Sequence, residues 1–358
     1  MTEFKLMRRR AIFYGIVALL ILAGCAGPPV KTPGPENVIV YPPPPAQPRI
    51  QFLTSFSNSE QFEGQQKSFN KFVFGKQEPQ PIVKPYGITV SGNKLFICDA
   101  GIGGLEILDL KEQTFDYFIP GGLGQLQFPI NCCVDDEGFL YVADGNRKQV
   151  VIFNRELTYH DAISLESEFK PTDVFVTGSE IYVSSAEAQA IYRFDRINHE
   201  MTGKIPQGSS NGPGKLYQPV NFTLSDNMIF ISDLGGCRVS LYDTDGNYQS
   251  GFGSPGNGFG QFTRPKGIAV DREEIIYVVD AAFENVQVFD KKGNLLTYFG
   301  GTYKGPGDMW LPADVTIDYN SLEYFSEYVY PEFNISYLIF VTSQYGPGKV
   351  SVYGFIRD

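Results

Sequence analysis

The chain has 358 residues, of which 14% are aromatic, and it carries a formal charge of −11 at pH 7. This length allows one large all-β domain or two average domains, and the aromatic content supplies material for an extensive core. The acidic balance makes nucleic acid a poor partner, because a polyanion is repelled by a negative surface. For the same reason a bare anionic membrane is a poor partner, so membrane attachment would need a device other than charge.

The first 24 residues have the features of a secretory signal. Four basic residues near the start precede the apolar run 11–22, which is shorter than the roughly 20 residues that span a bilayer. Small residues follow the run, as they do before a cleavage site. Residues 1–24 hold four positive charges and one negative charge, so their removal leaves the remainder of the chain at −14.

The end of this segment, Leu22-Ala23-Gly24-Cys25, resembles a bacterial lipobox. The resemblance implies that Cys25 is acylated and becomes the first residue of the mature chain, which then reaches the membrane through its lipid. It also implies sorting to the outer membrane, because the next residue is Ala26 rather than Asp. The alternative is an ordinary secretory signal with a chance cysteine at the cut.

A proline-rich tether is predicted to follow the lipidated cysteine, over residues 25–48. Residues 26–48 contain nine prolines, four of them consecutive at 42–45. This composition disfavours helix and sheet and favours polyproline II. We therefore expect a stiff spacer between the lipid and a folded body that begins at Arg49.

The body, residues 49–358, repeats one unit six times. The units begin at Pro85, Pro129, Pro171, Pro219, Pro265 and Pro312. They recur every 42 to 48 residues, and most contain four short β-rich runs separated by turns. A period of this length with short alternating strands predicts the blades of a β-propeller.

The fifth unit resembles the NHL-repeat family of six-bladed propellers most clearly, in RPKGIAVDREEIIYVVDAAFENVQVFDKKGNLLTYFGG (264–301). The resemblance extends over the whole body and implies the fold, but it does not imply one activity, because such folds host many functions. The last unit lacks a fourth strand, whereas RIQFLTSF (49–56) is unmatched before the first unit. We therefore expect an all-β, six-bladed β-propeller whose ring is closed by this N-terminal strand.

A possible metal site comes from the residues two places after each proline. Four of the six positions carry short oxygen-bearing side chains, namely Asn131, Asp173, Asn221 and Asp314. Inner strands converge on the channel of a propeller, and calcium takes six to eight oxygen ligands. The set is similar to the mix of Asn, Asp and Glu with which six-bladed lactonases hold calcium. The alternative is structural, because Asn and Asp tolerate tight backbone at a strand start and bond their own turns.

The sequence lacks the residue combinations of several known catalytic sites. An NHL-type amidating lyase would require three zinc-binding histidines, whereas this chain has only His160 and His199. Neither a G-x-S-x-G nucleophile motif nor a phosphate-binding loop is present. In four units the second β-rich run ends in an acid. These acids are expected to accept hydrogen bonds from backbone amides of turns: Asp99, Asp144, Asp233 and Asp280. The cysteines that follow the signal are expected to act as small buried hydrophobes: Cys98, Cys132, Cys133 and Cys237.

The sixth unit departs from the others by an insertion, residues 319–337. It is about 16 residues longer than the bridge of the fifth unit, and it holds seven aromatic residues and three Glu with no Lys or Arg. Ser321 could cap a short helix that runs to about Val329. The patch predicted to dock a protein comprises Glu323, Tyr324, Glu327 and Tyr328. The alternative is a plug that packs on its own blade, and in either case we expect the insertion to cover or flank the far end of the channel.

The leading functional hypothesis is a noncatalytic outer-membrane lipoprotein, a propeller scaffold that binds another cell-envelope protein. A second hypothesis is a calcium-dependent hydrolase of the lactonase or esterase kind, with its site at the channel mouth. A third is a glycan-binding module, which the aromatic content permits without a specific motif. The sequence does not identify the partner or the ligand.

Overall fold

The computed structural model describes residues 38–63, 78–165, 168–207 and 212–357. The predicted signal peptide, the lipobox and Cys25 lie outside the described residues. Within the described ranges, no helix is both long enough and apolar enough to cross a membrane.

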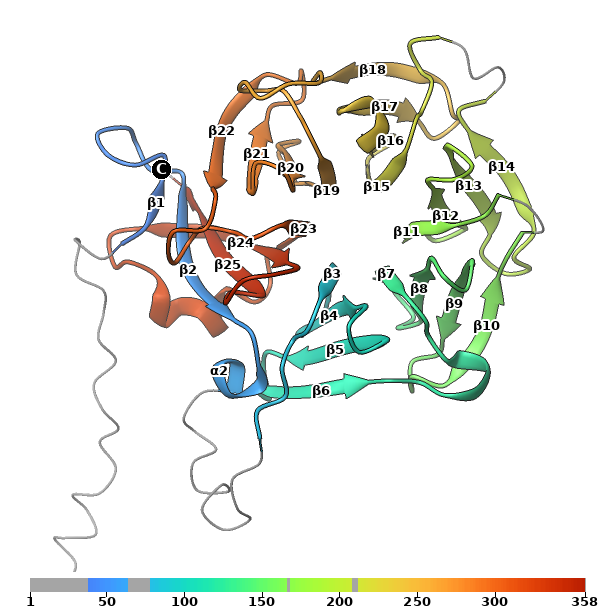
Figure 1. The fold of residues 1–358 in the computed structure, drawn as a ribbon, viewed down its shortest axis with the longest axis horizontal. Coiled ribbons are helices and arrows are strands. Elements are labelled where there is room, and N and C mark those ends of the chain that lie inside the picture. Colours follow the sequence, from blue (N-terminus) through green and yellow to red (C-terminus); the bar gives the residue numbers. More distant parts are fainter. Residues whose placement is uncertain (1–37, 64–77, 166–167, 208–211, 358) are drawn as a thin grey trace, which may run out of the picture.

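Six antiparallel sheets surround a central axis as the blades of a propeller (Figure 1). Blade one comprises β3 (Pro85–Ser91), β4 (Lys94–Asp99), β5 (Gly104–Asp109) and β6 (Thr114–Phe118). Blade two comprises β7 (Pro129–Val134), β8 (Leu140–Asp144), β9 (Gln149–Phe153) and β10 (Tyr159–Ile163). Blade three comprises β11 (Pro171–Val176), β12 (Glu180–Ser185), β13 (Ala190–Asp195) and β14 (Met201–Ile205).

The remaining blades follow the same plan with one extension. Blade four comprises β15 (Pro219–Ser225), β16 (Met228–Asp233), β17 (Arg238–Asp243) and β18 (Tyr248–Phe252). Blade five comprises β19 (Pro265–Val270), β20 (Ile276–Asp280), β21 (Asn285–Phe289) and β22 (Leu295–Gly300). Blade six comprises β23 (Pro312–Asp318), β24 (Asn334–Ser343), β25 (Val350–Arg357), β2 (Ile50–Phe56) and β1 (Val40–Tyr41). The predicted all-β, six-bladed fold is confirmed.

The core lies between adjacent blades, which explains the burial pattern along each blade. The second strands are buried on both faces, as β8 and β20 show by being buried at every residue. The fourth strands instead alternate between exposed and covered residues, as in β22. One inter-blade cluster joins Phe96 and Cys98 of blade one to Leu140 and Val142 of blade two. Apolar runs are therefore continuous near the axis and alternating at the rim.

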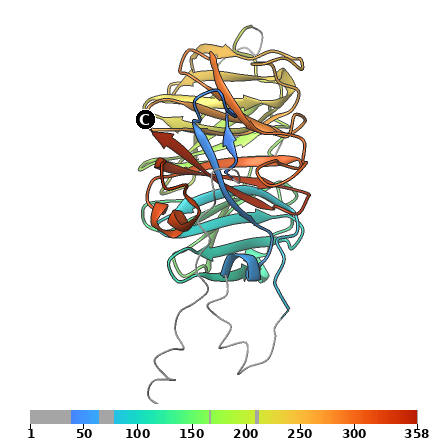
Figure 2. The same cartoon turned by 90° about the vertical axis from the view of Figure 1, so that its left-hand side faces the viewer.

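The ring is closed by the N-terminal strand β2, as the missing fourth strand predicted. β2 pairs antiparallel with β25, from Ile50 opposite Phe355 to Phe56 opposite Val350. Figure 2, an edge view, shows β2 in blue crossing the edge that the red C-terminal strand also occupies. Ile50, Leu53 and Phe56 are buried, so closure buries apolar surface as well as satisfying a sheet edge.

The expectation of a tether without strand up to residue 48 is wrong at its C-terminal end. Val40 and Tyr41 form β1, a fifth strand that pairs with β2. The Tyr41 hydroxyl donates to the Gly307 carbonyl at 2.7 Å, and its ring packs near Phe299 and Tyr353. Prolines 42–45 lie beyond this pair in the turn that leads to β2, where their missing N–H groups remove no ladder hydrogen bond.

The acids that end the second strands have the predicted structural role. Asp99 accepts hydrogen bonds from the backbone N–H groups of Val83, Lys84 and Gly101. Asp280 accepts from those of Thr263, Arg264 and Ala282. Each acid thus fixes the residues that lead into its own inner strand. The cysteines are unpaired thiols; Cys98 and Cys132 are buried as predicted, whereas Cys133 and Cys237 are partly covered.

The described helices are short. They are α2 (Ser59–Glu63) and the 3₁₀ turns η3 (Gly122–Gly124), η4 (Leu234–Gly236) and η5 (Leu322–Tyr328). The last of these belongs to the insertion in blade six.

Candidate functional site

The insertion between β23 and β24 contains the expected short helix, η5 (Leu322–Tyr328), and its geometry is 3₁₀. Ser321 precedes the helix but makes no capping hydrogen bond with its side chain. The Asp318 carboxylate accepts from the backbone N–H groups of Asn320 and Ser321 at 2.9 and 3.0 Å, so it fixes the turn that leads into η5. The predicted serine cap is wrong, because the Ser321 side chain accepts no hydrogen bond from the first turn.

Contacts with blade six fix the position of the insertion. Phe325 is buried, and its ring lies 5.6 Å from that of Phe340. The Gln51 side chain of β2 holds two points of the backbone, donating to the Tyr328 carbonyl at 2.8 Å and accepting from the Tyr330 N–H at 3.1 Å. The insertion consequently lies on the outer part of blade six, against β2 and β24 (Figure 1), and the expectation that it covers or flanks the channel is wrong.

The residues of the predicted docking patch separate into two groups. A 3₁₀ helix has three residues per turn, so Tyr324 and Tyr328, four positions apart, do not share a face. Tyr324 packs against the core cluster between blades six and one. Glu323, Glu327 and Tyr328 are exposed, so these three remain available to a partner.

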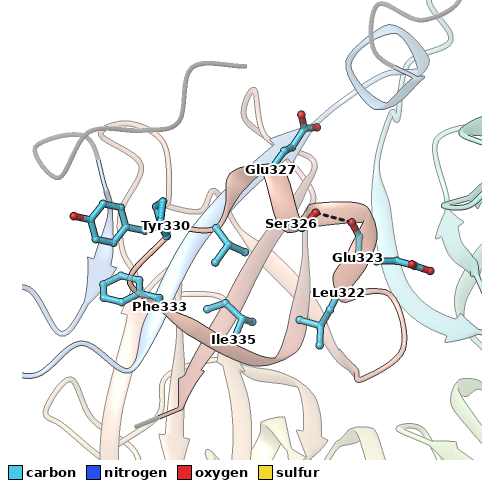
Figure 3. A pocket seen from close by; sticks show the side chains of 9 residues that line it. Leu322, Glu323, Ser326, Glu327, Tyr330, Phe333 and Ile335 are labelled. Carbon is cyan, nitrogen blue, oxygen red and sulfur yellow. Dashed lines mark hydrogen bonds between the residues drawn. The ribbon is translucent and has the colours of Figure 1, made fainter. Parts of the chain in front are cut away.

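Beside the exposed carboxylates lies a hollow of about 630 Å³, which we call the insertion groove. It is lined by Leu322, Glu323, Ser326, Glu327, Val329, Tyr330, Pro331, Phe333 and Ile335 (Figure 3). The rings of Tyr330 and Phe333 meet edge to face with centroids 5.2 Å apart. The Ser326 hydroxyl donates to the Glu323 carbonyl at 2.9 Å and steadies the turn. The groove therefore offers apolar walls and two carboxylates, with no basic residue in its lining.

The sequence analysis identified the two carboxylates of the groove and missed its apolar lining. Leu322, Tyr330, Phe333 and Ile335 stand in the same inserted stretch, on either side of Pro331. The proline and the aromatic residues around it were the available signal. The aromatic residues of the insertion were assigned to a docking surface, but only Tyr324 and Tyr328 among them were placed in the predicted patch.

The proposed metal ligands lie at the inner-strand starts, and backbone amides already occupy most of their oxygens. Asn131, Asp173 and Asp314 are buried, and Asn221 is partly covered. The Asp173 carboxylate accepts from Val174 N–H at 2.8 Å and from Phe222 N–H of the next blade at 2.9 Å.

The two other buried members of this set are engaged in a similar way. Asp314 accepts from Ile88 N–H at 3.0 Å, across the junction of blades six and one. The Asn131 carbonyl oxygen accepts from Cys132 N–H at 2.8 Å. Asp173 and Asp314 thus join neighbouring blades.

The pKa values of the two buried acids, Asp173 and Asp314, agree with a structural role. Burial raises the pKa of Asp314 to about 7, and burial together with the charge of Asp314 raises the pKa of Asp173 well above its usual range. In the described part of the chain, no group of three or more His, Cys, Asp and Glu side chains is arranged to hold a metal ion. The geometry favours the structural alternative, and the calcium site at Asn131, Asp173, Asn221 and Asp314 stays a prediction that calorimetric titration with calcium would test.

The two histidines lie at the outer part of blades two and three. His160 and His199 both line a hollow of about 320 Å³. His199 Nδ1 lies 2.8 Å from an Asp161 carboxylate oxygen, and the His160 ring packs edge to face on Phe139. They lie away from the inner strands, as the sequence indicated.

Comparison with known proteins agrees with the fold. The family DUF5128, described as "6-bladed beta-propeller", matches residues 215–286. No curated protein matches the sequence. Because the family match covers less than half of the chain, it supports the architecture without establishing membership.

Solved structures give the same result over a larger part of the chain. A gluconolactonase from Xanthomonas campestris is 14% identical, with 86% of this chain and 90% of that chain covered and a TM-score of 0.57. Virginiamycin B lyase from Staphylococcus aureus is 14% identical, with 75% and 80% covered and a TM-score of 0.53. Hydrazine synthase from Kuenenia stuttgartiensis is 13% identical, with 78% and 97% covered and a TM-score of 0.52. At such identities the likeness shows the fold alone, and the chain is a six-bladed β-propeller.

Proposed function

We propose that this protein is a noncatalytic, lipid-anchored outer-membrane protein with an NHL-type propeller, and that it binds another cell-envelope protein through the insertion groove. The observation that carries the proposal is the groove itself. It is built from residues that the repeat does not require, and it combines apolar walls with the exposed carboxylates of Glu323 and Glu327. Open apolar surface rimmed by polar groups is typical of protein-docking sites.

The chemistry of the groove indicates the kind of surface that it would accept. An apolar side chain of the partner would enter between Tyr330, Phe333 and Ile335. A neighbouring Lys or Arg of the partner would meet the carboxylates at the edge. The two hydrogen bonds from Gln51 hold the groove backbone in place before binding, which reduces the entropy lost on association.

Two observations favour binding over catalysis. The carboxylates at the channel already accept backbone amides, and the sequence lacks a recognisable nucleophile motif. The hydrolase and glycan-binding alternatives gain no specific support from the geometry. Hydrolysis of a lactone or ester by the purified protein, lost on substitution of Asp173 or Asp314 in a folded variant, would favour the hydrolase instead.

The lipid anchor is tested at Cys25. A lipid-anchored protein should fractionate with the outer membrane, because acyl chains contribute about 0.8 kcal/mol per buried CH₂. We expect Cys25→Ser to move the protein into the soluble fraction. A Cys25→Ser protein that stays in the outer membrane would contradict the anchor while leaving the groove untested by this result.

The groove is tested by charge reversal. The tagged full chain would be used to capture partners from detergent extract of the envelope, with Glu323→Lys and Glu327→Lys combined in one variant. We expect the variant to lose at least about 90% of the captured partner at unchanged melting temperature, because both side chains are exposed and surface changes usually alter stability by less than about 0.5 kcal/mol. The matched control is Glu112→Lys with Glu156→Lys, two exposed acids in blades one and two. Equal capture by the groove variant and the control would refute the docking role.

A further inference from the structure

At the opposite end of β23, three lysines lie over two tyrosine rings and an arginine stands near one of these lysines; we call this set the basic collar. Its members are Lys84, Tyr86, Arg264, Lys266, Tyr345 and Lys349. The Nζ atoms of Lys266 and Lys84 lie 5.4 and 5.8 Å from the centroid of the same Tyr86 ring. The Nζ atoms of Lys84 and Lys349 each lie 5.9 Å from the centroid of Tyr345. Three ammonium groups are therefore linked through two rings.

The propeller framework positions these residues. The Lys84 N–H donates to Asp99 at 2.9 Å and the Arg264 N–H donates to Asp280 at 3.2 Å, so the buried acids fix the backbone on which both cations stand. Lys266 belongs to blade five and Tyr86 to blade one, with β23 of blade six between them. Blade six carries Ala313 at the corresponding position, and its small side chain leaves room for the contact.

Two acids act on the collar from a distance, Asp314 on Lys266 and Asp99 on Lys349. None of its four cations forms an ion pair with a carboxylate of the described residues. Lys349 donates instead to two backbone carbonyls, those of Val83 and Gln344, at 2.9 and 2.7 Å. Cation–π contacts soften the repulsion between the ammonium groups but do not neutralise it.

The pKa values of two collar lysines reflect their burial and the positive charge around them. Burial, together with the charges of Arg264 and Lys84, lowers the pKa of Lys266 to about 8, while the charge of Asp314 opposes this shift. Burial also lowers the pKa of Lys349. An added anion stabilises cations that are held together in a partly buried place, because a nearby opposite charge favours the charged form of each group.

The site ends directly below the collar. A Cβ atom added at Gly87 would lie 2.1 Å from the Asn131 side-chain oxygen, and one added at Gly267 would lie 2.4 Å from the Asp314 carboxylate. The inner strands are therefore in close contact at this level, and the Asp314 carboxylate beside them would repel an anion. Arg264 and Tyr345 of the collar are exposed, whereas Lys84, Lys266 and Lys349 are partly covered.

We propose that the basic collar binds a small ligand that carries two or more carboxylate or phosphate groups. The ligand would sit at the channel mouth, with its charged groups among Lys84, Lys266 and Arg264 and within reach of the Tyr86 ring. This activity is separate from the docking of a protein at the insertion groove, because the two sites lie at opposite ends of β23.

Isothermal titration calorimetry of the full chain in detergent tests the collar, with inorganic pyrophosphate and citrate as probes at low ionic strength and pH 7. We expect saturable binding of at least one probe, weakened as salt is raised. Lys84→Met and Lys266→Met should each lower the affinity at least tenfold, while Lys94→Met, an exposed lysine at the far end of blade one, should leave it unchanged.

The melting temperature of each variant serves as the control for correct folding. Lys266→Met should melt at or above the temperature of the native chain, because it removes a partly buried charge that other cations repel. Absence of saturable heat with both probes would overturn the proposal. So would collar variants that melt normally and bind as tightly as the native chain.

Discussion

The insertion groove and the basic collar differ in charge, in origin and in place. The groove contains two carboxylates and no basic residue, whereas the collar contains four cations on a chain whose formal charge is −11. They lie at opposite ends of β23. The difference teaches that net charge describes the average surface and does not describe either site. An acidic protein can contain a strongly basic site where the local residues depart from the average.

The two sites also arose differently from the repeat. The groove is made by residues 319–337, which interrupt the sixth unit. Tyr345 and Lys349 of the collar follow β24, whereas its other four members occupy positions that every unit has, immediately before and after the strand-starting proline. These positions carry Lys84 and Tyr86 in blade one and Arg264 and Lys266 in blade five. The repeat tolerates such changes because the fold depends on the proline, the buried acid and the apolar strands rather than on these side chains.

Loss of the closing strand should destabilise the ring that carries both the insertion groove and the basic collar. A chain beginning at Ser57 lacks β1 and β2, and with them the buried side chains of Ile50, Leu53 and Phe56. Each is worth about 1.5–3 kcal/mol, so we expect the free energy of unfolding to fall by at least about 5 kcal/mol. The exposed edge of β25 should also promote aggregation. Thermal unfolding measures the loss, and an unchanged melting temperature would show that closure by β2 is unimportant.

A second experiment separates packing from docking inside the insertion. Phe325 is buried against Phe340, so Phe325→Ala should lower the free energy of unfolding by about 3–5 kcal/mol. Phe333 lines the groove and is only partly covered, so Phe333→Ala should change stability by less than about 1 kcal/mol while weakening partner capture. Chemical denaturation and capture from envelope extract measure the two effects. A stable Phe333→Ala variant with full capture would indicate that the groove is only a packing feature.

A third experiment addresses the collar alone, through pH. Lys266 has a pKa of about 8 and binds an anion better when protonated. Below pH 7 it is charged, and as the pH rises to 9 it loses the proton, so the affinity for citrate, whose own charge changes little over this range, should fall about tenfold. Asp314, with a pKa of about 7, ionises and weakens binding in the same direction.

The control for this experiment is the Lys266→Met chain. It should keep only the smaller change near pH 7 that Asp314 contributes. An identical pH dependence in the variant and the native chain would assign the effect to another group. Binding of citrate that strengthens above pH 8 would contradict the collar description.

The fold and its closure could be predicted from the sequence, because both depend on periodic features. Six prolines at regular spacing and the unmatched run 49–56 fixed the number of blades and the strand that completes the ring. The position of the insertion could not be predicted in this way. It depends on Phe325 entering the core and on Gln51 bonding the backbone at Tyr328 and Tyr330, and these contacts join residues about 280 positions apart.

The sequence errors have similar causes. A short helix capped by Ser321 was expected, but its geometry was not, because the segment is too short for helix propensity to decide between α and 3₁₀ geometry. β1 was missed because prolines 42–45 dominate the composition around Val40 and Tyr41. The collar escaped notice because Lys266 and Tyr86 lie in different units and meet only across blade six.

The most direct test of the proposed docking role is site-specific photo-crosslinking in living cells. A photoreactive phenylalanine analogue would replace Glu327 at the groove edge or, as the control, Glu112 on blade one. We predict one discrete cross-linked envelope protein from position 327, strongly reduced when Phe333→Ala is added and absent from position 112. Equal cross-linking at the two positions, or a product at 327 that Phe333→Ala leaves unchanged, would contradict the account.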